Sequence, residues 1–130
     1  MNISSNCSKE IIQSAEKYFG QPYVRATFNC AHFVANTYSD VGIIMPKFHA
    51  RMYPPHEFNL TQEEFERMPV GHSMFMKRKT SVSDRIWTHV AIVYSSNEII
   101  HCSHHFGDKV SITLKSEFIR VYGLVPKSPM

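Results

Sequence analysis

The sequence lacks any apolar run approaching the ~20 residues that cross a bilayer. It also lacks a charged start followed by an apolar stretch, which is the pattern of a signal peptide. We therefore expect neither a transmembrane helix nor a signal peptide. We expect the chain to start out in the cytoplasm. Internal repeats and low-complexity stretches are missing as well. With 130 residues, of which 43% are hydrophobic, the chain predicts a single domain, residues 1–130, around one core.

The sequence has no large excess of charge of one sign. Its net charge is only +3, and its densest basic run is Lys77–Lys79. Three basic residues without interleaved aromatics do not predict a nucleic-acid surface, so we expect no nucleic-acid partner. Such a run is typical of a solvated turn. The alternative is weak steering of the protein toward an anionic polymer such as cell wall.

Cysteine is scarce too, since the chain has only Cys7, Cys30 and Cys102. Three cysteines cannot all pair within one molecule, so at least one thiol is free unless chains are cross-linked. A disulfide between Cys7 and Cys102 stays open if the protein works outside a reducing compartment. The odd count favours a reactive thiol.

Helices are predicted in the first half of the chain. Apolar residues recur at helical spacing from Ser8 to Phe19. A second helix is expected to start near Cys30, with Asn29 as its N-cap and Gly42 as the left-handed residue that closes it. A capping-box pattern at Thr61–Glu64 predicts a third, short helix.

Strands are predicted after Gly71, where the pattern changes to period two and to β-forming residues. The expected strands are Ser73–Lys77, Thr88–Ser95, Glu98–Ser103, Val110–Leu114 and Ile119–Val125. Helices followed by strands predict an α+β domain in which an antiparallel sheet packs on the Cys30 helix.

Cys30 is the candidate nucleophile because it stands at the predicted start of a helix. A thiol attacks as the thiolate, and the unpaired amides and the dipole at a helix start lower a thiol pKa. The same amides are candidates for an oxyanion hole. A lone cysteine at a helix start is otherwise read as a small buried hydrophobe, so the surrounding residues decide between the two interpretations.

His89 and His101 are the candidate partners of this thiol. His89 lies in a strand of apolar and small residues, where a buried histidine is costly without a partner, and we predict that it is the base. His101 is predicted to hold the His89 ring in one tautomer and orientation. The two share a face of the sheet only if the loop between their strands has an odd number of residues. We expect a three-residue loop, residues 95–97, with Asn97 in the left-handed conformation.

Several segments, taken in order, resemble the NlpC-type cell-wall peptidases. Tyr18–Tyr23 and Phe28–Val34 are similar to the family's Gly-x-Pro-Tyr loop and its Asp-Cys-Ser-Gly-Phe-Val nucleophile motif. The further matching segments are Gly42–Lys47, Pro69–Phe75, His89–Tyr94 and Ile99–Ser103. The resemblance covers nearly the whole chain, from about Tyr18 to Val125, and its specificity lies in the order of the motifs.

The resemblance implies a papain-like fold, a triad of Cys30, His89 and His101, and no cofactor or metal. It also implies an endopeptidase that cuts between γ-D-glutamyl and diaminopimelate or lysine in peptidoglycan stem peptides. Tyr23, placed near the thiolate, and Ala31, next to the nucleophile, are the implied substrate-orienting residues. For Tyr23, simple packing of its loop onto the core is an equally open interpretation.

The chain departs from the family around the nucleophile. Asn29 replaces Asp, Ala31-His32 replaces Ser-Gly, and the loop between Tyr23 and Cys30 is shorter. Asn-Cys-x-His-Phe-Val instead resembles the lecithin retinol acyltransferase branch of the superfamily, in which the histidine strand precedes the cysteine. Here the cysteine comes first. The alternatives are therefore an acyltransferase, amidase or thioesterase on lipid or protein substrates, or a catalytically inactive module that binds in its cleft.

The sequence also bears on a possible zinc site, on two further histidines and on binding partners. A zinc site combining Cys30 and His32 with residues 101–105 is disfavoured by ligand spacing. His104 and His105 are expected to be exposed at a strand tip. Because peptidoglycan lies outside the cytoplasm, a cell-wall substrate predicts delivery by a secretion system or a phage tail, with a delivery or immunity protein as partner. The chain itself is expected to be a monomer.

Overall fold

The computed structural model describes residues 5–45, 62–79 and 85–125. Two of the sequence predictions fall partly outside the described residues. They are the capping-box residue Thr61 and the end of the matching segment, Pro46 and Lys47. The described elements, in chain order, are α1 (Ser5–Glu16), α2 (Cys30–Ser39), α3 (Gln62–Arg67), β1 (Ser73–Arg78), β2 (His89–Val93), β3 (Glu98–Ser103), β4 (Lys109–Leu114), α4 (Lys115–Phe118) and β5 (Tyr122–Leu124). Among these helices, none is long and apolar enough to cross a membrane.

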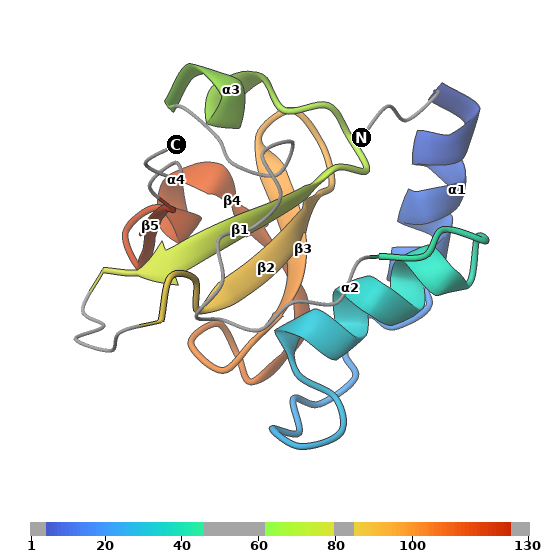
Figure 1. The fold of residues 1–130 in the computed structure, drawn as a ribbon, viewed down its shortest axis with the longest axis horizontal. Helices are drawn as coiled ribbons and strands as arrows, with labels where there is room; N and C mark the ends of the chain where they lie inside the picture. The colour runs from blue at the N-terminus through green and yellow to red at the C-terminus, as the bar shows by residue number, and fades with distance from the viewer. Residues whose placement is uncertain (1–4, 46–61, 80–84, 126–130) are drawn as a thin grey trace.

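The strands form one antiparallel sheet in the order β4-β3-β2-β1-β5, so the predicted α+β architecture is confirmed. Strands β1 to β4 follow one another along the chain and across the sheet. The last strand, β5, pairs with β1 at the opposite edge from β4. Figure 1 shows α1 and α2 on one side of this sheet and α4 on the other.

The sheet therefore has two buried faces with different contents. We call the face under α1 and α2 the helix face and the opposite one the histidine face. Sheet residues of the helix face are Phe75, Val90, Ile92, Ile100, Cys102 and Val110. The core of the histidine face contains Met74, Met76, Ala91, Val93, Ile99, Phe118 and Tyr122. This division follows from the alternation of side chains along each strand.

Helix α2 starts where the sequence predicts, because Asn29 caps it. The Asn29 side chain accepts from the amides of Ala31 at 2.9 Å and His32 at 3.1 Å. In return, the Asn29 amide donates to Nδ1 of His32 at 3.1 Å, which completes a capping box. Gly42 has a φ of 82°, as expected for the residue that closes this helix.

Several local expectations are wrong. Helix α1 ends at Glu16, and the chain turns before the exposed Phe19. Lys77 and Arg78 belong to β1 and are not a solvated turn. The sequence also did not predict α4, whose four residues are too few to show a helical period. Asn97 is not left-handed, since Asp108, at φ 58°, is the one non-glycine residue with positive φ in the described chain.

Candidate active site

The two predicted histidines meet on the histidine face. Nε2 of His89 lies 2.8 Å from Nδ1 of His101, and the two side chains are 3% and 0% exposed. Val93 pairs with Ile99, and the Tyr94 amide donates to the Glu98 carbonyl at 3.0 Å, so Tyr94 stands opposite Glu98. Three residues, 95–97, therefore make the turn between the paired positions. The predicted odd loop is thus confirmed, and the His89–His101 contact follows from the strand register.

The polar chain continues from His101 to β4. Nε2 of His101 lies 2.9 Å from Oγ1 of Thr113, a residue that sequence reasoning did not single out. Phe106 and Phe118 pack against the His101 ring with centroid distances of 5.2 Å and 5.4 Å. The second histidine therefore has two polar contacts inside an otherwise aromatic enclosure.

Tyr122 covers the His89 ring and was also missed by sequence reasoning. Its ring stacks on the His89 ring with a centroid distance of 4.4 Å and an interplanar angle of 12°. The Tyr122 hydroxyl is 2.9 Å from Oγ of Ser103, so the ring that covers His89 is fixed at its far end. No sequence signal places β5 beside His89, because the pairing of β5 with β1 is long-range.

Burial determines the charge of both imidazoles. Desolvation is the largest cause that lowers the pKa of His89 well below its usual value, and the neighbouring His101 adds to it. Desolvation lowers the pKa of His101 to about 3. Both rings are therefore neutral near neutral pH, which is the state in which His89 can accept a proton.

Cys30 is the first residue of α2 and belongs to the core of the helix face. Burial raises the pKa of its thiol, while backbone amides, that of Val90 foremost, act in the opposite direction. The expected lowering by the helix start is thus outweighed, because the sulfur is desolvated as well as capped by amides. The Val90 amide places the sulfur next to the residue that follows His89. Within the described chain, however, no hydrogen bond joins this sulfur to the His89 ring.

The implied orienting residues, Tyr23 and Ala31, both lie near Cys30. Tyr23 is half-buried, and after desolvation the charge of Cys30 is the next cause that raises its pKa, so Tyr23 lies within electrostatic reach of the thiol. The Ala31 amide is already engaged by Asn29. The Cys30 amide also acts on the sulfur and lowers the pKa of the thiol, in the same direction as the amides of Val90 and Ala31. The short loop before α2 closes through paired hydrogen bonds of Val24 with Phe28.

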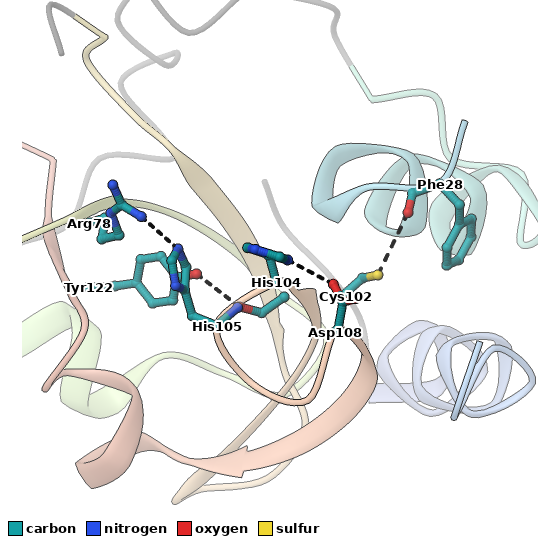
Figure 2. Close-up of polar contacts among 8 residues, drawn as sticks. Phe28, Arg78, Cys102, His104, His105, Asp108 and Tyr122 are labelled. Carbon is teal, nitrogen blue, oxygen red and sulfur yellow. Dashed lines mark hydrogen bonds and ion pairs between the residues drawn. The ribbon is translucent and has the colours of Figure 1, made fainter. Parts of the chain in front are cut away.

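The turn after β3 forms a polar rim beside Tyr122, shown in Figure 2. His104 and His105 are exposed, as expected for residues beyond a strand end. Nδ1 of His104 lies 2.9 Å from a carboxylate oxygen of Asp108, and Nε2 of His105 lies 2.9 Å from a guanidinium nitrogen of Arg78. A guanidinium only donates, so Nε2 of His105 accepts from Arg78, and burial and the Arg78 charge lower the pKa of His105. A neutral His105 and the cation of Arg78 therefore stand side by side next to the ring that stacks on His89.

The other cysteines play different parts from Cys30. Cys102 lies on the helix face, where its thiol points toward the Phe28 carbonyl at 3.9 Å (Figure 2). The part of the chain that the structure describes contains no disulfide, so the Cys7–Cys102 bridge left open above is not formed. His101 and Cys102, two of the residues considered for a zinc site, project to opposite faces of the sheet.

No protein-family model and no curated protein matches the chain. Solved structures do match. An NlpC/P60 family protein from Bacillus cereus matches 96% of this chain with 20% identity and a TM-score of 0.66, and the NlpC2 protein of Trichomonas vaginalis matches 95% with 18% identity and a TM-score of 0.69. This chain spans 42% and 47% of those proteins. The NlpC/p60 domain of the peptidoglycan hydrolase SagA matches 90% of this chain at 21% identity, with 97% of that domain covered and a TM-score of 0.61.

Proposed function

Because the chain has the fold of the NlpC/P60 proteins, we propose that it is a cysteine hydrolase that cleaves an amide bond in peptidoglycan stem peptides. The observation that carries this proposal is the 2.8 Å contact between His89 and His101, while Val90, the residue after His89, directs its amide at the Cys30 sulfur. Nucleophilic acyl transfer needs a neutral imidazole that can reach a thiol at a helix start.

We propose a separate role for each ring nitrogen of His89. Nε2 is engaged by His101, so Nδ1 is the atom that takes the proton of the Cys30 thiol. Neutral His89 has the lone pair that this transfer needs, and the transfer forms a thiolate and an imidazolium together. Burial, which lowers the pKa of His89 and raises that of Cys30, opposes this charge separation, so we propose that bound substrate offsets its cost. The sulfur and the ring are not hydrogen-bonded in the structure, but such contacts commonly tighten when substrate binds.

The thiolate then attacks the carbonyl carbon of the scissile amide. Its oxygen becomes negative and accepts a hydrogen bond from the Cys30 amide at the helix start. As the C–N bond breaks, Nδ1 of His89 gives its proton to the leaving amine. Water next attacks the thioester with Nδ1 as general base, which releases the acid and returns the thiol. Throughout, His101 holds the ring of His89 in place.

The substrate assignment rests on likeness. One of the matching structures is a domain of a peptidoglycan hydrolase, and that domain corresponds to almost the whole of this chain. The ordered motifs resemble peptidases of the γ-D-glutamyl to diaminopimelate type, and we propose this bond. Action in the cell wall after delivery by a secretion system or a phage belongs to the same proposal.

The acyltransferase, amidase or thioesterase activity is the second candidate function, and it rests on the Asn-Cys-x-His motif. In the structure Asn29 and His32 form the capping box of α2. This capping stabilises the start of the helix that presents Cys30 and is compatible with either activity.

Mass spectrometry of muropeptides tests the proposed function. We expect the purified protein to release a cleaved stem peptide with a new amino terminus at diaminopimelate or lysine, and Cys30→Ala to release none. A parallel incubation with a phospholipid acyl donor tests the alternative. Acyl transfer to an amine without muropeptide cleavage would contradict the proposal, as would cleavage that survives in Cys30→Ala.

A further inference from the structure

His101 has one polar partner on each ring nitrogen. Nδ1 contacts His89 at 2.8 Å and Nε2 contacts Oγ1 of Thr113 at 2.9 Å. The ring is fully buried, and Phe106 and Phe118 pack against it. Within the described residues, Thr113 is thus the group that satisfies Nε2. A buried N–H at this position without an acceptor carries a substantial desolvation cost.

The contacts form a chain of hydrogen bonds that can run in two directions. A neutral imidazole carries one N–H and one lone pair, so the proton on one nitrogen fixes the role of the other. If Nε2 of His101 donates to Thr113, then Nδ1 of His101 accepts from Nε2 of His89. Nδ1 of His89 then has a lone pair. If Thr113 donates instead, both rings reverse and the proton moves to Nδ1 of His89, which can no longer accept one from a thiol.

When His89 is protonated, the hydrogen bonds from His89 through His101 to Thr113 must run in the same direction as when His89 is a neutral acceptor. When His89 has taken the thiol proton it carries N–H on both nitrogens, and its Nε2–H must donate to Nδ1 of His101. Neutral His101 then carries its proton on Nε2, and the acceptor for that proton is the hydroxyl oxygen of Thr113. The hydroxyl proton of Thr113 has access to water, because this residue is only half-buried.

We propose that Thr113 is a positioning residue that accepts from His101 Nε2–H and so keeps the lone pair of His89 Nδ1 free for the Cys30 thiol. This inference rests on the proposed function, because it takes His89 as the base. The strand register supports it: Ile99 pairs with Thr113 and His101 with Ser111, so Thr113 stands diagonal to His101 on the same face. Oγ of Ser111 turns away and donates to the Phe106 carbonyl at 3.2 Å.

The test combines a spectroscopic and a kinetic measurement on the full chain. In protein labelled with ¹⁵N-histidine, the ring nitrogen shifts of His101 report which nitrogen carries the proton; His101→Gln identifies the signals. We expect the proton on Nε2 in the wild type and a shift toward Nδ1 in Thr113→Val. Alkylation of Cys30 by iodoacetamide, followed by mass spectrometry of its peptide, should slow by roughly five- to a hundredfold in Thr113→Val, the equivalent of losing one buried hydrogen bond.

Two variants separate positioning from packing. Thr113→Ser keeps the oxygen and should restore both the His101 tautomer and the alkylation rate. Ser111→Ala removes a hydroxyl from the same strand and should change neither. A wild-type proton on His101 Nδ1, an unchanged tautomer in Thr113→Val, or a Thr113→Ser as slow as Thr113→Val would overturn the proposal. If the proposed function fails instead, Cys30 alkylates in the wild type no faster than in the unfolded chain, while the tautomer result stands by itself.

Discussion

The two faces of the sheet are both buried, but they are built for different tasks. On the helix face, the Cys30 thiol is surrounded by aliphatic and aromatic side chains such as Phe33, which hold α2 against the sheet. On the histidine face, a polar chain of His89, His101 and Thr113 lies inside a similarly apolar core. Close packing fixes the position of Cys30, the proposed nucleophile, and hydrogen bonds hold the ring of His89, its proposed base. Substitutions on the helix face should therefore affect stability first, and substitutions on the histidine face should affect chemistry first.

The largest expected effect is at Cys30, which lies on the helix face but is the proposed nucleophile and therefore departs from that rule. Cys30→Ala should lower the rate of amide cleavage by about four to six orders of magnitude, because it removes the nucleophile. The free energy of unfolding should change by only about 1 kcal/mol, since the side chain is small. Cleavage is measured on isolated muropeptides and stability by urea unfolding. A loss of stability large enough to explain the loss of activity would make Cys30 a packing residue.

The helix face alone is tested by Phe33→Ala. Phe33 is fully buried in α2, so the cavity should lower the free energy of unfolding by about 3–5 kcal/mol. Molecules that remain folded should keep their activity, because Phe33 contacts no group of the polar chain. Urea unfolding and activity per folded molecule are the measurements. A stability change below about 1 kcal/mol would show that α2 is not held by this core.

The histidine face is tested by pH. The pKa of His101 is lowered from 6.5 to about 3, so between these values the unfolded chain binds a proton that the folded chain does not. The free energy of unfolding should therefore fall as the pH decreases from about 6.5 toward 3, by up to about 1.4 kcal/mol per pH unit for each such proton. The pKa of His89 is also lowered, so His89 adds to the loss of stability at low pH. His101→Gln should flatten this dependence, measured by urea unfolding at several pH values; parallel curves for the two proteins would contradict the burial of a neutral His101.

The smallest effect concerns the cap that presents Cys30. Asn29→Ala removes the acceptor for the amides of Ala31 and His32 and should cost about 1 kcal/mol of stability. Asn29→Asp keeps an acceptor oxygen and is the matched control, which should stay near the wild type. Thermal unfolding of the three proteins is the measurement. Equal destabilisation by both substitutions would mean that the Asn29 side chain acts through something other than the cap.

Much of the fold and part of the site follow from local sequence patterns. Asn29 and Gly42 mark the two ends of α2, and both act as predicted because capping depends on a few neighbouring residues. The sharing of a face by His89 and His101 was also predictable, since it depends only on strand alternation and on the number of loop residues. The predicted left-handed conformation of Asn97 was wrong, because several loop conformations contain the same odd number of residues.

What the sequence could not supply involves long-range pairing. Thr113 and Tyr122 look like ordinary strand residues, and nothing near them in the sequence relates them to the histidines. They reach the site because β4 and β5 take their places in the sheet. The short α4 was missed for a related reason, since it turns the chain toward the far edge through tertiary packing of Phe118.

By itself, the sequence determined the elements that carry Cys30, His89 and His101, because capping, periodicity and alternation are local properties of a chain. Only the tertiary structure decided which side of the sheet each group occupies, what covers it, and which protonation state it prefers. The pKa of Cys30 is the clearest case: the helix start alone predicts a lowered value, and burial in the folded core raises it. Desolvation depends on every element that packs around a group, so it cannot be read from the neighbours of that group in the sequence.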